Sequence, residues 1–596
     1  MTFEEKIYKI VSSKKGQRKI GFIVLGFLLF SVAMIPTQIV LAKMLPGKSA
    51  NTFSIYIDTA TNSTIKQTRE VSECVMDMIK KEPAVKNMET FLGQGAPLDY
   101  AGLVKGSAFK ALKNQAEIVV NLTDKHEREE PSYMMVHRLR PIVKKRCENI
   151  YKNATVRFIE MPSGPPTFAT IVVNLYGKDS LLLRETAKTV KSSLEETEGL
   201  VDIDTMQDDV YEKFEIIPNV EKIISSNLSV DQVSNILYMA FKGSIVATKN
   251  SVNQQDQIPI FVSLDVKTRT LERSSKKELE LKLSRLKLLN KQGMMVPIKE
   301  VVSIVPTVAD PTIFKKNMRN MVSVTAECDL VSQVYPLMDA RELMITKLKK
   351  DFEVERLIGA STYMFDLALV HKQTGEKVLV RWDGEMKVSL DTFRDLGGAF
   401  ISALVLMFLL MVVYYKSFVL SGIVLVGSFL SIIGVIIGHY ITDFIFLHFI
   451  SGVHFYLTAT SLIGFISLMG ISARSSLLLI DFTKSLIESG IEKNRAIAIA
   501  TATRAKPILL TAVAIILGSL LLATDPIFGG LGIALIFGSM ASTAVSLYYI
   551  PVLMAKAEAI CPQNDVIVCE EGQGLNEEGL DVSGMKPEVH HGNPVS

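Results

Sequence analysis

The sequence predicts a membrane domain of six transmembrane helices joined to a large external α+β domain of βαβ-type subdomains. Hydrophobic residues make up 48% of the 596 residues and the mean hydropathy is +0.28. In a chain of this length, that balance indicates membrane segments rather than one oversized core. Apolar runs long enough to cross a bilayer occur once before residue 43 and five times after residue 394. The segment between them has the short alternating and amphipathic patterns of an α+β domain.

The N-terminal segment, residues 1–19, is basic and precedes an apolar run at residues 20–42. This run is longer than the apolar part of a signal peptide and lacks a small-residue cleavage site. We therefore expect residues 20–42 to form the first transmembrane helix. The lysines and arginines before it place residues 1–19 in the cytoplasm by the positive-inside rule.

Residues 43–394 are predicted to form the external domain. Alternating stretches such as FSIYI, AEIVVNL and TIVVNLYG have the period of strands, and amphipathic helical patterns lie between them. The β-α-β succession occurs at least twice before Gly243, which favours small layers of helices on antiparallel sheets. Residues 244–304 interrupt the pattern and are predicted to be an insertion.

Residues 395–555 are predicted to hold transmembrane helices two to six. The five apolar segments are 396–413, 419–437, 456–480, 507–523 and 531–553. The loops at 414–418 and 481–506 contain lysine and arginine, whereas those at 438–455 and 524–530 contain neither. Six spans with both ends inside satisfy every loop, so residues 43–394 are expected in the periplasm of a two-membrane cell.

Two further segments lie outside the predicted spans, one between the fourth and fifth spans and one after the sixth. The connection at 481–504 is predicted to be an amphipathic helix at the membrane surface. The tail, residues 556–596, is polar and acidic and is predicted to be a disordered cytoplasmic segment.

Composition and motifs exclude several functions. The net charge of +3 gives no electrostatic reason to expect nucleic acid as a partner. The five cysteines have neither CxxC nor Cys/His spacing, so we expect free thiols and no metal site. We also expect no cofactor and no enzymatic activity, since neither a catalytic set nor a GxxxxGK[ST] loop is present. A transporter without a nucleotide site takes its energy from an ion gradient, which requires ionisable groups inside the membrane.

Arg474 is the one charged residue inside the predicted span cores, which contain no Asp or Glu. A charge at the bilayer centre costs about 2.5–3.5 kcal/mol on insertion scales, so such residues are rare and usually functional. The plainer alternative is that Arg474 reaches the cytoplasmic surface with its long side chain. Arginine stays protonated, so it needs an anion from elsewhere rather than carrying the proton itself. Thr511 in the next span is weak by itself, because membrane threonines mostly bond to their own backbone.

Four motifs resemble those of resistance-nodulation-division (RND) efflux permeases. GISARSSLL at 470–478 is similar to the family's G-[LI]-S-A-K-N-A-I-L, and RAKPILLT at 504–511 is similar to R-x-R-P-I-L-x-T. GMMVP at 293–297 and FGSM at 537–540 are further matches. The order of one span, a large domain and five spans resembles the C-terminal half of such a permease.

The resemblance assigns roles to four residues. Arg474 stands where the family has the lysine of its proton relay, and Thr511 stands at the relay threonine. Ser475 replaces an asparagine, and it and Arg504 are possible supports of the relay. The aspartate pair that takes the proton lies in the family's other half, so the resemblance implies a partner subunit that supplies it. Arginine keeps the charge of lysine but has a planar, forked head group, which changes the pairing geometry.

The resemblance implies a half-subunit of an inner-membrane efflux pump that exports hydrophobic or amphiphilic compounds by proton antiport. A trimer-type assembly, a periplasmic adaptor and an outer-membrane channel are the implied partners, and 244–304 is the implied docking region. One alternative is a homomeric half-size exporter of lipids, hydrophobes or metal ions. Another is a non-transporting membrane scaffold or protein-translocation accessory. Methionine pairs such as Met294 and Met295 are better explained by packing than by metal binding.

Overall fold

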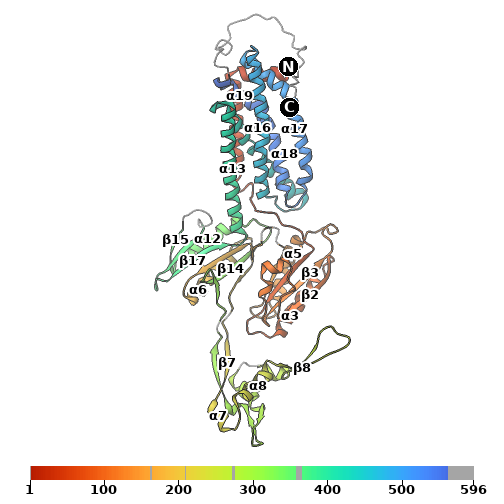
Figure 1. Ribbon diagram of the computed structural model, residues 1–596, viewed down its shortest axis with the longest axis vertical. Helices are drawn as coiled ribbons and strands as arrows, with labels where there is room; N and C mark the ends of the chain where they lie inside the picture. Colours follow the sequence, from red (N-terminus) through yellow and green to blue (C-terminus); the bar gives the residue numbers. More distant parts are fainter. Residues whose placement is uncertain are drawn as a thin grey trace, which may run out of the picture.

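The structure, a computed structural model, describes residues 2–161, 164, 166–208, 210–271, 275–309, 311–357 and 365–560. The molecule is elongated (Figure 1). A helical bundle forms one end, two subdomains of sheet and helix lie side by side in the middle, and a narrower unit forms the other end. Among the described residues, six helices are long and apolar enough to cross a membrane, the same number as the spans predicted from the sequence.

Two of the six spans found among the described residues are built from more than one helical segment. Their helices are α2 (Lys14–Ala33), α13 (Glu385–Tyr415), α14 (Phe418–Phe429), α15 (Ile432–Ile445), α16 (Ala459–Glu488), α17 (Lys493–Ala523), α18 (Gly529–Ala544) and α19 (Ile550–Lys556). The third span joins α14, α15 and a short π-helical turn, and the sixth joins α18, another such turn and α19.

Several predicted boundaries in the membrane domain differ from the structure, and the second and fifth spans begin earlier than predicted, at Glu385 and Lys493. The first helix begins at Lys14 and ends at Ala33, because Ser13 caps its N-terminus and the chain turns after Met34. The third span continues to Ile450 rather than ending at 437. The predicted surface helix at 481–504 was wrong: α16 continues straight to Glu488, and a short turn leads into α17.

The N-terminal segment forms an amphipathic helix, α1 (Phe3–Ser12), which packs against α17 and α19. A capping box between Thr2 and Glu5 starts it, and each residue bonds a backbone amide of the other. Ile7 and Val11 are fully buried in a cluster that they share with residues of the membrane helices, among them Leu420 and Leu479. The basic N-terminus is therefore anchored to the bundle.

The first external subdomain is an antiparallel four-stranded sheet in the order β2-β3-β1-β4. Its elements are β1 (Thr52–Asp58), α3 (Ile65–Ile79), β2 (Val85–Leu92), α4 (Tyr100–Lys105), β3 (Gln115–Leu122), α5 (Ser132–Cys147) and β4 (Thr155–Ile159). Helices α3 and α5 pack on the sheet and on each other. Their apolar faces and alternate residues of the strands form one buried cluster.

A disulfide joins Cys74 on α3 to Cys147 on α5, with a Cα–Cα distance of 5.8 Å. The expectation of free thiols was therefore wrong for these two residues. Because the bridge depends on two helices packing side by side, the separation of 73 residues gave no sign of it. Cys328 is a free cysteine. Cys561 and Cys569 lie outside the described residues, as does most of the predicted tail.

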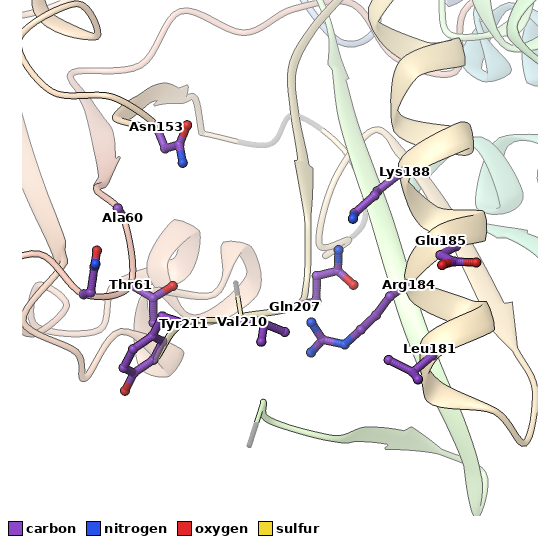
Figure 2. A pocket seen from close by; sticks show the side chains of 11 residues that line it. Ala60, Thr61, Asn153, Leu181, Arg184, Glu185, Lys188, Gln207, Val210 and Tyr211 are labelled. Carbon is purple, nitrogen blue, oxygen red and sulfur yellow. The ribbon is translucent and has the colours of Figure 1, made fainter. Parts of the chain in front are cut away.

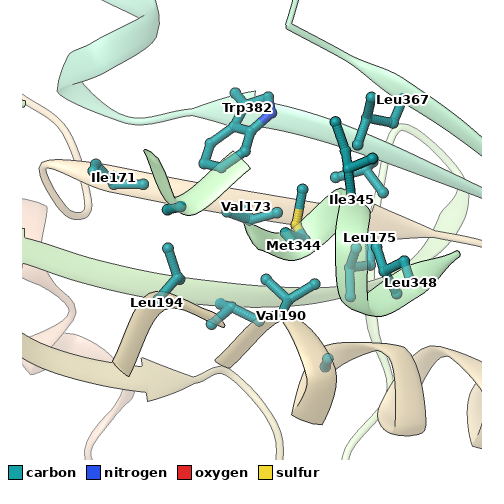
Figure 3. Packing of buried hydrophobic residues seen from close by; sticks show 14 of the residues in the cluster. Ile171, Val173, Leu175, Val190, Leu194, Met344, Ile345, Leu348, Leu367 and Trp382 are labelled. Atoms are coloured by element: carbon teal, nitrogen blue, oxygen red, sulfur yellow. The ribbon is translucent and has the colours of Figure 1, made fainter. Parts of the chain in front are cut away.

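The second external subdomain is a seven-stranded sheet in the order β13-β14-β5-β17-β16-β15, with β6 also paired to β14. Its elements are β5 (Ile171–Tyr176), α6 (Ser180–Glu195), β6 (Leu200–Thr205), β13 (Phe314–Lys316), β14 (Arg319–Cys328), α12 (Val334–Leu348), β15 (Phe352–Arg356), β16 (Leu367–His371) and β17 (Lys377–Asp383). Helices α6 and α12 pack together over the sheet and bury a single cluster that includes Trp382 (Figure 3).

The third external unit is connected to the second subdomain by two strands, β7 (Glu212–Pro218) and β12 (Val302–Val308), which pair antiparallel. Its other elements are α7 (Val220–Ser225), α8 (Val230–Phe241), β8 (Ser244–Lys249), β9 (Ile258–Val262), α9 (Val266–Arg269), α10 (Lys276–Arg285), β10 (Lys287–Leu289), β11 (Met295–Pro297) and α11 (Ile298–Val301). The hairpin of β8 and β9 projects away from the rest of the unit (Figure 1). The unit has its own buried cluster around Ile223 and Leu283.

Candidate functional site

Helix α16 presents Arg474, and one of its faces is firmly fixed in the bundle. The Ser472 hydroxyl donates to the carbonyl of Gly427 (3.1 Å), and the Ser428 hydroxyl donates to the carbonyl of Met469 (3.4 Å), so α16 is bonded to α14. Gly464 allows close contact with α18, since a Cβ there would lie 2.9 Å from that of Ala534. This face therefore sets the rotation of α16.

The opposite side of α16 is an exposed stripe. It consists of Ile463, Ser467, Gly470, Arg474 and Leu478, called here the outer stripe. The spacing of three or four residues keeps these positions on one side of the helix. Space beside Gly470 is open, since nothing lies within 4 Å of a Cβ built there. Within the described part of the chain, Arg474 makes neither a hydrogen bond nor an ion pair.

Thr511 is also exposed, on α17, which packs along α16 in the opposite direction. Arg474 lies 14 residues before the end of α16 and Thr511 lies 18 residues after the start of α17. At 1.5 Å per residue, these positions are about 21 and 27 Å from the connecting turn, which is a similar depth. The Thr511 hydroxyl donates to the carbonyl of Pro507 (2.9 Å), as membrane threonines commonly do. The structure gives no contact between Arg474 and Thr511.

The two possible supporting residues are not joined to Arg474 either. The Ser475 hydroxyl donates to the carbonyl of Ile471 (3.3 Å) on its own helix. The Arg504 guanidinium lies over the ring of Phe482, 4.7 Å from its centroid, and is half buried there. Its position links α17 to the C-terminal part of α16 and favours a packing role.

His439 is an ionisable membrane residue that the sequence reasoning missed. It is fully buried on α15, with Nδ1 2.8 Å from the Val435 carbonyl and Nε2 2.8 Å from the Ser461 hydroxyl. The predicted span stopped at residue 437, so His439 was assigned to a loop. The apolar residues that continue to Ile450 were the signal that could have included it. Both ring nitrogens are paired, so His439 ties α15 to α16.

A cavity of about 500 Å³ lies between the first two external subdomains (Figure 2). Ala60, Thr61 and Asn153 line it from the first subdomain, and Arg184 and Lys188 line it from α6 of the second. The walls are mostly polar. A smaller cavity of about 110 Å³ lies between the same two subdomains and is lined by residues such as Lys43, Arg140, Glu160 and Cys328.

Burial raises the pKa of the Glu160 carboxyl from 4.5 to about 7, with Glu327 and Asp329 adding to the rise and Arg140 and Lys43 opposing it. Between pH 4.5 and about 7, the folded protein therefore holds a proton at Glu160 that the unfolded chain releases. The stability this contributes is fully present below pH 4.5 and is lost as the pH rises through about 7.

We therefore expect Glu160→Gln to flatten the fall in stability between pH 5.5 and 8.5, because the amide does not ionise. Thermal unfolding of the purified wild-type and variant proteins across this range measures it. Glu195→Gln, at an exposed position on α6, is the matched control and should leave the pH profile unchanged. An unchanged profile for Glu160→Gln would contradict the assignment.

The sequence profile described as the AcrB/AcrD/AcrF family matches residues 2–558. The chain belongs to this family. The resemblance to RND efflux permeases is thereby confirmed.

Individual relatives are more distant. The swarming motility protein SwrC of Bacillus subtilis (strain 168) is 23% identical over 532 residues, covering 88% of this chain and 44% of SwrC. The cobalt-zinc-cadmium resistance protein CzcA of Cupriavidus metallidurans is 22% identical over 410 residues, covering 67% of this chain and 34% of CzcA. The chain thus spans less than half the length of these curated relatives.

Solved structures share the fold. Two crystal forms of a heavy metal efflux pump align with TM-scores of 0.69 and 0.68 at 16% identity. Each alignment covers 92% of this chain and 51% of the pump chain. The architecture of the membrane bundle and the β-sheet-rich domain is therefore that of an RND pump.

Proposed function

We propose that this chain is a half-subunit of an RND efflux pump in the inner membrane, with its large domain in the periplasm. It exports hydrophobic or amphiphilic compounds by proton antiport and works with a second half-subunit that carries the aspartate pair. It acts as a transporter rather than an enzyme.

The exposed Arg474 is the observation that carries the proposal. A positive charge on the outer stripe, without a partner among the described residues, is costly if lipid covers that stripe. A second half-subunit that covers the stripe and places a carboxylate against Arg474 removes most of that cost. Gly470, one turn away, leaves room for a close helix. Protonation of the partner's carboxylate would weaken the pairing and allow the two halves to shift.

The other residues have supporting roles in this mechanism. Thr511, at a similar depth on α17, is positioned to bond the partner's carboxylates once its side chain turns from the Pro507 carbonyl. The Asp481 carboxylate lies two turns further along α16 and accepts a hydrogen bond from the Tyr414 hydroxyl (3.2 Å). It is closer to the inner end of the helix than Arg474, so we assign the relay acid to the partner instead.

Two features of the external domain support its placement and assembly. The Cys74–Cys147 disulfide is typical of an oxidising compartment such as the periplasm. The hairpin of β8 and β9 carries exposed apolar side chains, with Ile245 59% and Phe261 56% exposed. Exposed apolar patches of this kind mark protein contacts, in agreement with a trimer-type assembly. A periplasmic adaptor and an outer-membrane channel complete the proposed pump.

Metal ions are the second candidate substrate. This candidate is favoured by the names of CzcA and of the two crystal structures, which are metal-resistance and heavy metal efflux proteins. Over the described residues, no group of three or more His, Cys, Asp and Glu side chains is arranged to hold a metal ion. We therefore place amphiphiles first.

Growth inhibition distinguishes these candidates. Cells without their own efflux pumps would express this chain, the aspartate-bearing half, or both, and would be exposed to dyes and bile-salt detergents or to cobalt, zinc and cadmium salts. We expect resistance to the amphiphiles only when both halves are present. Resistance to the metals alone would support the second candidate, and resistance from this chain alone would support a homomeric exporter.

A further inference from the structure

The first two external subdomains are separate folding units that meet along one surface. Each has its own buried apolar cluster, and neither cluster extends into the other subdomain. Within the external domain, the chain passes directly from one to the other only between β4 and β5. The two subdomains lie side by side below the membrane bundle (Figure 1). Their relative position therefore depends on the contacts across this surface, called here the seam.

The centre of the seam is a buried ion pair. Arg140 on α5 is 5% exposed, and the side chain of Asp202 on β6 is 1% exposed. The Asp202 carboxylate accepts from Arg140 Nε (3.1 Å), Lys144 Nζ (2.9 Å) and the backbone amide of Phe158 (3.2 Å). All three donors belong to the first subdomain. Asp202 thus extends from one subdomain into a socket built by the other.

Asp202 also has an unusual backbone, with φ at +51°. Non-glycine residues rarely adopt this left-handed conformation, although aspartate tolerates it better than most. Such conformations persist where the surroundings hold them in place. Here the socket around the carboxylate provides that restraint.

Further ion pairs continue along the seam on both sides of Asp202. Asp329, which follows β14, pairs with Arg140 Nη1 (2.6 Å), and its carboxylate is also within hydrogen-bond distance of His137 Nδ1 (2.8 Å). The other pairs are Lys105–Glu327 (2.7 Å) and Arg157–Asp204 (2.6 Å). In every one of these pairs, the basic group comes from the first subdomain and the carboxylate from the second.

A seam of this kind differs physically from an apolar core. The attraction within a buried ion pair is largely offset by the cost of removing both charges from water. When the two sides of such a surface separate, both charged groups become hydrated again. The free energy of separation is therefore lower than that of exposing an apolar surface of the same size. The pairs also fix one register, because each side chain has a specific partner.

We propose that this seam is an electrostatic latch that holds the two external subdomains closed, with Asp202 as its central residue. The cavities of about 500 and 110 Å³ lie between the same subdomains and become one open cleft when the latch parts. The latch belongs to the external domain and can be tested without measuring export, so it stands or falls separately from the proposed function.

Cys328 provides a native probe of the latch. It is a free thiol, partly buried, and lines the smaller cavity together with Arg140. Asp202 and Asp204 do not line that cavity, so changing them leaves its walls intact. The experiment uses the purified full-length chain in detergent, with Cys561→Ser and Cys569→Ser to remove the tail thiols. The rate at which N-ethylmaleimide labels Cys328 is followed by mass spectrometry.

We expect Asp202→Asn to raise the labelling rate by about tenfold or more, because it leaves Arg140 and Lys144 without their shared carboxylate. Asp204→Asn breaks the pair with Arg157 and should give a smaller increase. Asp339→Asn, at an exposed position on α12 of the same subdomain, is the matched control and should label at the wild-type rate.

Trp382, the single tryptophan, reports by its fluorescence whether the second subdomain of each variant is folded. If Asp202→Asn does not fold, Asp204→Asn alone decides the question. Wild-type labelling rates in the folded seam variants would overturn the latch. Equally fast labelling of Asp339→Asn would also overturn it, because the effect would then not be specific to the seam.

Discussion

Arg474→Ala is expected to reduce export to the level of cells that lack the chain, when both half-subunits are expressed. The substitution removes the positive charge from the outer stripe. A carboxylate on the partner is then attracted to α16 no more strongly when it is ionised than when it is protonated, so its protonation no longer shifts the two halves. Insertion of the chain should not suffer, because removing an arginine from the middle of a span saves about 2.5–3.5 kcal/mol on insertion scales. Efflux of a fluorescent dye from loaded cells measures the result, and immunoblots of membranes give the amount of protein.

Two variants control this experiment. Arg474→Lys should retain much of the export, because it keeps the positive charge. The compact ammonium, however, cannot make the bidentate hydrogen bonds to a carboxylate that a guanidinium can make. Ser467→Ala changes another residue of the outer stripe and should leave export unchanged, since the bond that its hydroxyl makes among the described residues is to its own helix, at the Ile463 carbonyl. Full export by Arg474→Ala at normal membrane levels would remove Arg474 from the relay.

The membrane domain could be predicted from the sequence because crossing a bilayer is a property of each segment by itself. A run of about 20 apolar residues indicates a span wherever it lies in the fold. Helix ends were harder to predict, since they depend on caps and turns: Ser13 starts α2 ahead of its apolar run. An error at one such end, that of the third span, placed His439 in a loop instead of in the membrane.

In the external domain, the secondary structure could be predicted from the sequence, whereas the contacts between distant residues could not. Its strands and helices followed from periodicity, but its charged contacts join residues far apart in the sequence. Arg140 and Asp202 are 62 residues apart and Lys105 and Glu327 are 222 apart, so nothing near either partner indicates the other. The Cys74–Cys147 bridge was hidden for the same reason. The role of Arg474 could be inferred from a motif, whereas its exposure on the outer stripe required the packing of α16.

Replacing both Cys74 and Cys147 with serine is expected to destabilise the first external subdomain by about 4 kcal/mol, within the usual range of about 2–5 kcal/mol. The bridge closes a loop of 73 residues, and opening it restores that conformational freedom to the unfolded chain. Both sulfur atoms lie within or against the buried cluster between α3, α5 and the sheet, so two hydroxyls there add a further cost. Urea-dependent proteolysis of the purified protein, followed at cleavage sites within residues 46–160, measures the loss.

Reduction offers an independent check of the same quantity. Wild-type protein treated with dithiothreitol should lose nearly the same stability, because reduction opens the loop without changing the residues. Cys328→Ser is the matched control, since Cys328 is a free thiol outside this subdomain and should leave the transition in place. If the double variant unfolds at the wild-type urea concentration, or if alkylation without reduction labels Cys74 and Cys147, the two cysteines are not bridged. In that case the disulfide would no longer support a periplasmic location for the external domain.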